Sequence, residues 1–370
     1  MVAKTSWQSG VANRVSEMTK VLFTHQATVP AYRIDLFNML HELSSGKIEF
    51  FFINSAKVSR RENLGSIYNY RFHIIPVKTA YLSYFKIQTW VFQIKKYDCI
   101  VFENCFNNLT NLLAFPLCKI LGKKTVLIGH YKDNTRHNDH WINRIKSSFY
   151  KYFDGVLAYT EKEADFFRKK NKNVLPFNNT INVSQNREAL IDNFKHRDIY
   201  REKLGIKPEA IALLYVGRID SRKGFDESLV SKIIEIENIN FLVVGGKLPI
   251  SYEEVIEFDH SNDINLLSEL FIASDLYMHP GDVGLGPITA VSFGLKPLFF
   301  KKRNHNPEEY YLQDINSARV DSVQEFIDLI KNGEHSDSLG KRISISNSIR
   351  FLSLENSAAQ IIKLIRNAID

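Results

Sequence analysis

The stretch Leu213-Leu-Tyr-Val-Gly-Arg-Ile-Asp-Ser-Arg-Lys-Gly-Phe-Asp226 joins a short apolar run to a glycine and a group of closely spaced cations. The apolar run predicts a buried strand that ends at Gly217, where the missing side chain lets a ligand approach the backbone. Ligands of parallel α/β sheets bind at this carboxyl edge. Arg218 and Lys223 would then face a phosphate group and neutralise charge on a departing diphosphate. The competing interpretation is a turn with solvated surface cations.

A second glycine-rich stretch follows another predicted strand: His279-Pro-Gly-Asp-Val-Gly-Leu-Gly-Pro-Ile-Thr-Ala-Val-Ser-Phe-Gly294. Gly284 and Gly286 allow close backbone approach, and Pro287 suits the first turn of a helix. The free amides of that helix terminus could hold a diphosphate, although a plain strand-to-helix turn would have the same composition. Two such elements in one half of the chain favour nucleotide binding.

Strand-like and helix-like segments alternate through both halves of the chain. Short apolar runs without strict alternation suit parallel strands that helices cover on both faces. They lie at residues 20–23, 48–53, 99–102, 125–128 and 155–159, and again at 211–216, 241–244, 276–279 and 296–300, before a helical stretch at 322–331. We therefore predict an α/β protein with two Rossmann-like, doubly wound parallel-sheet domains.

The length of 370 residues suits two domains. We expect a loosely ordered leader at residues 1–19, a first domain at 20–190, a second domain at 191–342 and a C-terminal tail at 343–370. The polar, charged segment 182–209 marks the boundary between the domains. Apolar residues of the tail recur at helical spacing, so one or two amphipathic helices could pack back on the first domain.

Both glycine-rich motifs resemble the donor-site motifs of retaining glycosyltransferases of family four. Arg218 and Lys223 match the two cations that contact the donor diphosphate in that family. The resemblance implies a GT-B fold, in which two domains face a central cleft, and a nucleotide-sugar donor on the second domain. It also implies that the Pro307-Glu308 pair lies near the donor. We expect Gly246 at the donor site too, although the short segment 246–256 departs from the family, which normally inserts a helix there.

The chain departs from that family at the sugar-binding motif. The family has a glutamate, then Phe-Gly-Leu, then a second glutamate eight positions after the first. Here Val283-Gly284-Leu285 replaces Phe-Gly-Leu, and Gly281 and Thr289 stand at the glutamate positions, which resembles a group of the family with Val-Gly-Leu. On this resemblance Asp282 partly replaces the first glutamate, and Thr289 offers the ribose an uncharged hydrogen bond.

Several residues of the first half follow predicted strands and are candidates for the acceptor site. The loop 24–33 follows the first strand and contains Pro30, Tyr32 and Arg33. Glu103 and Asn104 follow another strand, where a polar loop is an equal alternative. His130 matches a histidine near the transferred sugar in some family members, although a lone histidine at a strand end is more often structural. Residues 178–181 resemble the asparagine-containing turn before the interdomain linker.

Positive charge is concentrated in the first half of the chain. Residues 1–190 hold 27 Lys and Arg against 14 Asp and Glu, a net charge of +13, whereas residues 191–370 have a net charge of −6. Segments 81–96 and 141–152 interleave aromatic and basic residues, as helices resting on an anionic membrane do. Core-facing helices with snorkelling lysines are the alternative, and no nucleic-acid-binding module accompanies these segments.

The composition excludes several protein classes. No uncharged apolar run reaches the ~20 residues that a membrane span needs, and the first nineteen residues lack the apolar region of a secretory signal. Cys99, Cys105 and Cys118 have neither zinc-like nor disulfide spacing, so we expect buried thiols in a reducing compartment. We therefore predict a cytoplasmic protein that contacts the inner face of the cytoplasmic membrane peripherally.

These observations predict transfer of a sugar from a UDP- or GDP-linked donor to a glycan or lipid-linked acceptor, with retention of configuration, in surface polysaccharide assembly. We expect no cofactor, and no catalytic metal because the chain has no Asp-x-Asp triplet. The first alternative is a non-catalytic GT-B-like scaffold that has lost the two glutamates. A dinucleotide-dependent Rossmann enzyme is disfavoured, because Gly-x-Gly-x-x-Gly does not follow the first strand.

Overall fold

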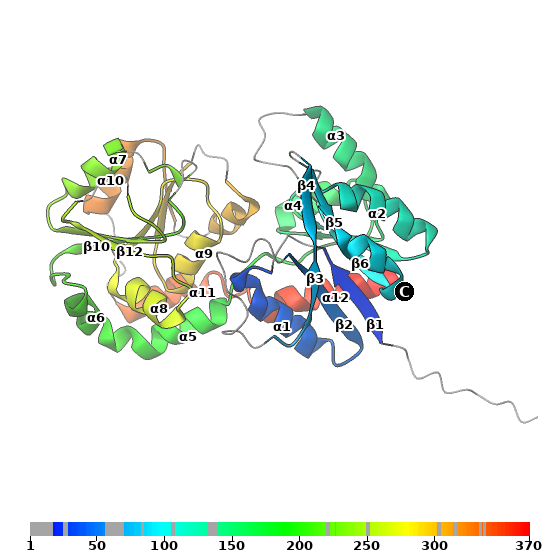
Figure 1. Ribbon diagram of the computed structural model, residues 1–370. Helices are drawn as coiled ribbons and strands as arrows, with labels where there is room; N and C mark the ends of the chain where they lie inside the picture. The colour runs from blue at the N-terminus through cyan, green and yellow to red at the C-terminus, as the bar shows by residue number, and fades with distance from the viewer. Residues whose placement is uncertain are drawn as a thin grey trace, which may run out of the picture.

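A computed structural model describes residues 18–24, 29–55, 70–82, 85–104, 108–131, 140–219, 223–225, 227–248, 252–301, 305–313, 315, 317–332, 335 and 338–370. Two parallel sheets, each covered by helices, form two lobes that lie side by side (Figure 1). The central strands are mostly buried, as expected of parallel strands with helices on both faces, whereas the edge strands are only partly buried. The nine predicted strand segments are all strands, and the α/β class is confirmed.

The first sheet has the strand order β3-β2-β1-β6-β7-β8-β9. Its direction of winding reverses between β1 and β6, so the loops after these two strands diverge at the carboxyl edge. The strands are β1 (Thr19–Phe23), β2 (Ile48–Ser55), β3 (His73–Val77), β6 (Cys99–Glu103), β7 (Lys124–Gly129), β8 (Gly155–Ala158) and β9 (Val174–Pro176).

Helices cover both faces of this sheet. The helical elements of this region are η1 (Ala31–Arg33), α1 (Ile34–Leu43), η2 (Thr89–Lys96), α2 (Leu109–Ile120), α3 (His140–Phe149), η3 (Tyr150–Tyr152) and α4 (Glu161–Arg168).

Two of the three cysteines are free and buried within the first domain, Cys99 and Cys118. Burial raises the pKa of the Cys118 thiol to about 12. Cys105 lies outside the described residues.

The second sheet has the strand order β12-β11-β10-β13-β14-β15, and its winding reverses between β10 and β13. These are the two strands that precede the glycine-rich motifs. The strands are β10 (Ile211–Val216), β11 (Ile239–Val244), β12 (Val255–Phe258), β13 (Leu276–His279), β14 (Pro297–Phe300) and β15 (Ala318–Val320). The helices are α7 (Glu227–Ile234), α8 (Ile264–Ala273), α9 (Leu285–Ser292), the 3-10 helix η6 (Pro307–Leu312), α10 (Val323–Asn332) and α11 (Leu339–Asn347).

The expected boundary at residue 190 falls inside α5 (Val183–Asn193), and Leu190 is buried in the core of the second sheet. The polar segment around it is helical rather than a linker, since α5 is followed by η4 (Phe194–His196) and α6 (Arg197–Lys203). These helices pack on the second sheet, and α5 contacts α8 and α9. Of the predicted leader, residues 1–17 lie outside the described part of the chain.

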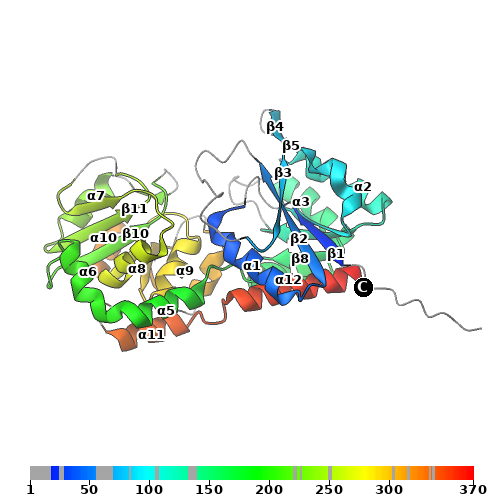
Figure 2. The ribbon, with the colours of Figure 1, turned by 60° about the horizontal axis from the view of Figure 1, so that its bottom comes forward.

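The last helix, α12 (Leu354–Ile369), returns to the first domain. Its apolar side, including Leu354, Ile361 and Ile365, is buried in one core with β1 and α1. Figure 2 shows the chain pass from α11, under the second sheet, to α12, beside α1. The chain therefore joins the two domains twice.

The segment at 81–96 is not the helix that we expected. It forms an antiparallel ribbon of β4 (Thr79–Leu82) and β5 (Phe85–Gln88), followed by the 3-10 helix η2. Along β5, Phe85 and Ile87 are exposed while Lys86 and Gln88 are buried, so exposure has the two-residue period of a strand. Segment 141–152 is helical, as α3 and η3. Among the described residues, no helix has the length and apolar character needed to cross a membrane.

Candidate functional site

The predicted donor residues meet where the winding of the second sheet reverses, at the carboxyl ends of β10 and β13. Gly217 donates its N–H over 2.9 Å to the oxygen of Val244, the last residue of β11. Gly245 follows β11 and has a φ of +113°. A side chain at Gly245 would place Cβ 2.3 Å from Gly217 O, so the two backbones approach this closely only because residue 245 is glycine; a Cβ at Gly217 would lie 2.7 Å from the Tyr215 hydroxyl. Gly246 lies next to Ile219, where a Cβ would be 3.3 Å from that side chain.

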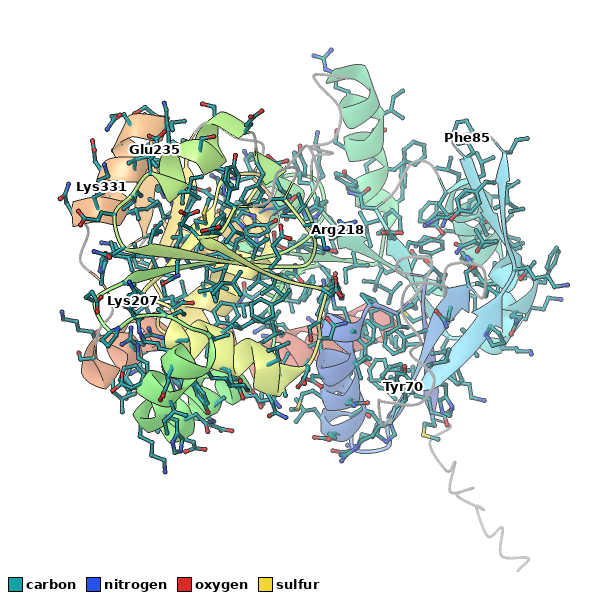
Figure 3. The ribbon with its side chains drawn as sticks, turned by 60° about the vertical axis from the view of Figure 1, so that its left-hand side comes forward. Tyr70, Phe85, Lys207, Arg218, Glu235 and Lys331 are labelled. Atoms are coloured by element: carbon teal, nitrogen blue, oxygen red, sulfur yellow. The ribbon has the colours of Figure 1, made fainter. Side chains whose placement is uncertain are left out.

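Arg218 begins the loop after this glycine turn. Its backbone oxygen accepts a 2.8 Å hydrogen bond from the Tyr215 hydroxyl, and its side chain is exposed. Figure 3 shows Arg218 on the side of the second domain that faces the first, whereas Lys207, Glu235 and Lys331 lie on outer surfaces. The guanidinium is therefore available to a ligand held between the domains.

Lys223 and His279 hold the loop after β13 in place. The backbone carbonyl oxygen of Asp282 accepts hydrogen bonds from Lys223 Nζ at 3.3 Å and from His279 Nε2 at 2.9 Å. Burial, with the charge of Lys223 as a second cause, lowers the pKa of His279 to about 3, so this imidazole is neutral at physiological pH. Sequence reasoning placed Lys223 and Asp282 at the site but missed this role of His279.

The helix α9 presents its N-terminus at the same place. Gly284 is its N-cap residue and has no side chain with which to cap the helix. A Cβ at Gly286 would lie 2.6 Å from the Tyr277 hydroxyl, so only glycine fits there. The amides of Leu285 and Gly286 belong to the first turn and have no partner within the helix, which suits an anion. The hydroxyl of Thr289 donates to Leu285 O at 3.1 Å, so Thr289 can only accept a hydrogen bond from a ribose.

Glu308 reaches the first domain from η6 of the second. It is 4% exposed, and its Oε1 accepts a hydrogen bond from Asn179 Nδ2. Beside it, the Tyr311 hydroxyl donates to Tyr159 O at 2.7 Å and lies 3.2 Å from Asn178 Oδ1. The expected turn at 178–181 therefore contacts both domains.

His130 follows β7 and faces these residues. Its ring lies edge-on to Tyr159 with 4.2 Å between centroids, and its Nδ1 is 3.8 Å from Glu163 Oε1. Burial alone would lower the pKa of His130, but the negative charges of Glu163 and Glu308 outweigh it, so the pKa is raised. Glu163 is itself 8% exposed and accepts the N–H of Tyr131 at 2.9 Å.

Arg33 completes this group from the end of η1. It is 2% exposed, and its guanidinium lies 5.5 Å from the ring centroid of Phe177 and 5.8 Å from that of Tyr159. Pro30 caps η1, while Tyr32 is 43% exposed and lies against Arg33.

We call five residues that surround Tyr159 and Tyr311 the interdomain cluster: Arg33, His130, Glu163, Asn179 and Glu308. Each has a buried polar atom that finds no hydrogen-bond partner among the described residues, namely Arg33 Nε, His130 Nδ1, Glu163 Oε2, Asn179 Oδ1 and Glu308 Oε2. Native proteins leave few such atoms unpaired, so their concentration here marks a place where a polar ligand would bind. The sequence identified three of the five; Glu163 stands in a Thr160-x-x-Glu163 helix-capping pattern that accounts for it without any site.

Glu103 and Asn104 lie farther along the same edge of the first sheet. Asn104 Nδ2 donates to His130 O at 2.6 Å and to the Tyr150 hydroxyl at 3.0 Å. Glu103 pairs with Lys86, whose Nζ is 3.7 Å from its Oε2. Asn104 thus supports the loop of His130, and Glu103 is partly engaged by a buried lysine.

Comparison with known proteins fits this arrangement. No protein-family model matches the chain. A stretch of 141 residues is 34% identical to the lipopolysaccharide glucosyltransferase WaaG of Escherichia coli K12, and it covers 34% of this chain and 36% of that protein. The chain therefore matches about a third of the length of this relative.

Solved structures match almost the whole chain. Anabaena HepE in complex with UDP-glucose has a TM-score of 0.63 and 14% identity, covering 94% of this chain and 99% of that one. UDP-GlcNAc 2-epimerase from Methanocaldococcus jannaschii has a TM-score of 0.56 and 14% identity, covering 95% and 99%. The expected GT-B architecture, two doubly wound parallel-sheet domains, is confirmed.

Proposed function

We propose that this chain is a glycosyltransferase that takes a sugar from a nucleoside diphosphate donor on its second domain and transfers it to an acceptor on its first. One observation carries the proposal. Arg218, Lys223 and the N-terminus of α9 converge where the second sheet reverses its winding, and Arg218 lies on the side that faces the first domain (Figure 3). The relatives support the donor class, since one is named a glucosyltransferase, one binds UDP-glucose, and one is named for UDP-GlcNAc.

In this proposal the diphosphate is held entirely by protein cations and amides. Arg218 gives a two-pronged contact, Lys223 a point charge, and the amides of Leu285 and Gly286 further donors. These groups stabilise the negative charge that grows on the leaving diphosphate as the glycosidic bond breaks. Because two cations already offset this charge, we propose that transfer needs neither a metal ion nor a cofactor.

The transferred sugar would lie between the Asp282 loop and the interdomain cluster. Asn179 and Glu308 offer acceptors, and His130 with its raised pKa offers a donor, to sugar hydroxyls. Retention of the anomeric configuration is part of the proposal and rests on the resemblance of the Arg218 and Lys223 motif to retaining enzymes. The anomer of the product, assigned by NMR, tests it.

We propose a glycan or lipid-linked acceptor in surface polysaccharide assembly, with the enzyme resting peripherally on the cytoplasmic face of the membrane. The lipopolysaccharide glucosyltransferase relative supports this acceptor class. The β4–β5 ribbon supports the membrane contact, because it exposes Tyr81, Leu82, Phe85 and Ile87 in the basic half of the chain. Figure 2 shows this ribbon at the top of the first domain.

Substitution of the two cations tests the donor site. Arg218→Ala and Lys223→Ala should each lower turnover with the active nucleotide sugar by ~10²-fold or more, because each removes charge from the leaving group. The donor is first found by screening UDP- and GDP-sugars for thermal stabilisation of the protein.

Lys207→Ala, which removes a cation from the outer surface of the same domain, is the control and should leave turnover unchanged (Figure 3). Full turnover in Arg218→Ala and Lys223→Ala would contradict the assignment. Saturable binding of a nucleotide sugar by the native chain, without hydrolysis or transfer to any acceptor, would instead support the non-catalytic scaffold.

A further inference from the structure

A cavity of about 270 Å³ opens beside the proposed acceptor site, between α2, the end of α3 and the edge of the first sheet. Small-molecule pockets usually have ~300–1,000 Å³, so this one would hold a part of a ligand. Its walls are mostly aromatic and aliphatic, with Phe102, Leu112, Phe115, Phe149 and Phe153 among them. The acceptor candidates Glu103 and Asn104 lie on one wall, and the functions described above leave the apolar walls without a role.

The polar groups of the cavity are at its inner side. Asn111 is 6% exposed and donates to Glu103 O over 3.2 Å, while its Oδ1 is buried without a partner among the described residues. Asn104, on the same wall, donates to the backbone oxygen of His130. Asn104 therefore links the wall of the cavity to the backbone of His130, a member of the interdomain cluster.

The apolar groups reach the surface. Leu112 of α2 is 45% exposed, Phe149 of α3 is 47% exposed, and Pro116 of α2 is exposed as well. A pocket for a soluble ligand usually has the opposite arrangement, with apolar walls inside and polar groups at the rim. An apolar rim over a polar inner wall fits an amphiphile whose head lies inside and whose chain leads out.

Positive charge lies on the elements that carry the rim. Arg144 on α3 and Lys151 on η3 are exposed and stand five positions before and two after Phe149 in the sequence, in the half of the chain that has a net charge of +13. They favour contact with an anionic lipid surface, from which the hydrocarbon chain of an amphiphile would enter.

We infer that this cavity binds the first carbons of the hydrocarbon chain of a lipid-linked acceptor, with the acceptor's polar head directed past Asn104 toward His130. The inference rests on the proposed glycosyltransferase function and narrows its acceptor to an amphiphile. Glycans without a lipid would leave the apolar rim uncovered and the cavity unfilled.

Direct binding tests the inference. The probes are farnesyl phosphate and a series of n-alkyl β-D-glucosides below their micellar concentrations, titrated into the full-length protein by calorimetry, with inorganic phosphate and glucose as head-group controls. Affinity should rise about fourfold with each added methylene, because each buried CH₂ contributes ~0.8 kcal/mol. Preference for farnesyl phosphate over alkyl glucosides of similar chain length would identify an isoprenyl phosphate, and the reverse preference a glycolipid.

Leu112→Trp fills the mouth of the cavity and should weaken chain binding at least tenfold. Leu117→Trp is the control, since it places the same side chain on the same helix at a leucine that is 38% exposed and does not line the cavity. Ala80→Trp instead obstructs a larger cavity of about 700 Å³ between the β4–β5 ribbon and α2. Equal chain affinity in Leu112→Trp and Leu117→Trp, or loss only in Ala80→Trp, would overturn the inference.

Donor binding separates this inference from the proposed function. Leu112→Trp should retain the nucleotide-sugar stabilisation of the native chain while it loses chain binding. If no nucleotide sugar binds the native protein but chain binding remains sensitive to Leu112→Trp, the glycosyltransferase proposal fails and the lipid pocket stands. If donors bind and no chain-length dependence appears, only the lipid pocket fails.

Discussion

Glu163 contacts two adjacent residues that lie far from it in the sequence: it accepts the N–H of Tyr131 and faces the ring of His130. The hydrogen bond from Tyr131 would survive the loss of the carboxylate charge, because an amide oxygen also accepts a hydrogen bond. The effect on His130 would not survive, because its raised pKa depends on the negative charge. The charge state of the imidazole is therefore set by a carboxylate that itself lies outside the predicted donor site.

Glu163→Gln should lower the pKa of His130, because burial is then opposed by the charge of Glu308 without that of Glu163. In the native chain the pair stabilises the fold fully below the unfolded pKa of ~6.5, and this contribution disappears as pH rises through the higher folded pKa. In the variant this contribution should be lost, and once burial takes the folded pKa below the unfolded one the protein gains stability from this group as pH rises. NMR titration of the His130 ring protons measures the pKa directly.

Glu161→Gln is the matched control, because Glu161 lies on the same helix but pairs with Arg168 at the surface. It should leave the His130 titration in place. An unchanged His130 pKa in Glu163→Gln would show that the ring and the carboxylate do not interact.

At the scale of single elements, the contact between the ends of β10 and β11 depends on one glycine. Gly245→Ala should cost more than the ~1–2 kcal/mol of a left-handed residue, because its Cβ would also push against Gly217 O. Displacement of the Gly217 turn moves Arg218, so affinity for the nucleotide sugar should fall as well. Urea unfolding and donor titration measure the two effects.

Gly205→Ala gives the comparison. Gly205 has a φ of +72° with no atom within 4 Å of the added Cβ, so this variant carries the backbone strain alone. It should retain native donor affinity. Equal free energies of unfolding for the two variants would show that the Gly245 contact is not tight.

The sequence predicts elements where burial determines composition. Central strands such as β6 and β10 are covered on both faces and are continuously apolar, so they were identified to within a residue or two. The strands at the sheet edges, β3, β9, β12 and β15, were not predicted, because they are only partly buried and their composition is mixed. The ribbon β4–β5 was mistaken for a helix because its aromatic and basic residues suggested an amphipathic surface, although their alternation has a period of two.

The residues of the candidate site also fall into two groups, those that the local sequence identifies and those that it does not. Arg218, Lys223 and the turn of Gly284 and Gly286 lie within short motifs, so local sequence was enough to find them. The bond between Asn179 and Glu308 spans 129 positions, and only the folded chain brings the two together. Sequence patterns describe neighbours along the chain, and the interdomain cluster draws on elements from both ends of it.

For the whole molecule, the concentration of positive charge in the first half predicts selective binding to anionic membranes. The chain should float with vesicles that contain phosphatidylglycerol and not with pure phosphatidylcholine, and added salt should release it. Leu82→Ser with Phe85→Ser, on the exposed ribbon, should weaken flotation. Ile199→Ser removes a 59% exposed residue of the second domain and should have no effect. Equal flotation with both vesicle types would contradict an electrostatic contact.

The return of α12 to the first domain has a consequence for how the protein is made. Strands β1 to β9 leave the ribosome early, but the sixteen residues of α12 that cover the apolar surface of their sheet follow only after the whole second domain. Until α12 has emerged, the side of α1 and β1 that it covers stays open to water, and a nascent chain needs protection there. The half that is translated first is therefore completed only after the other half.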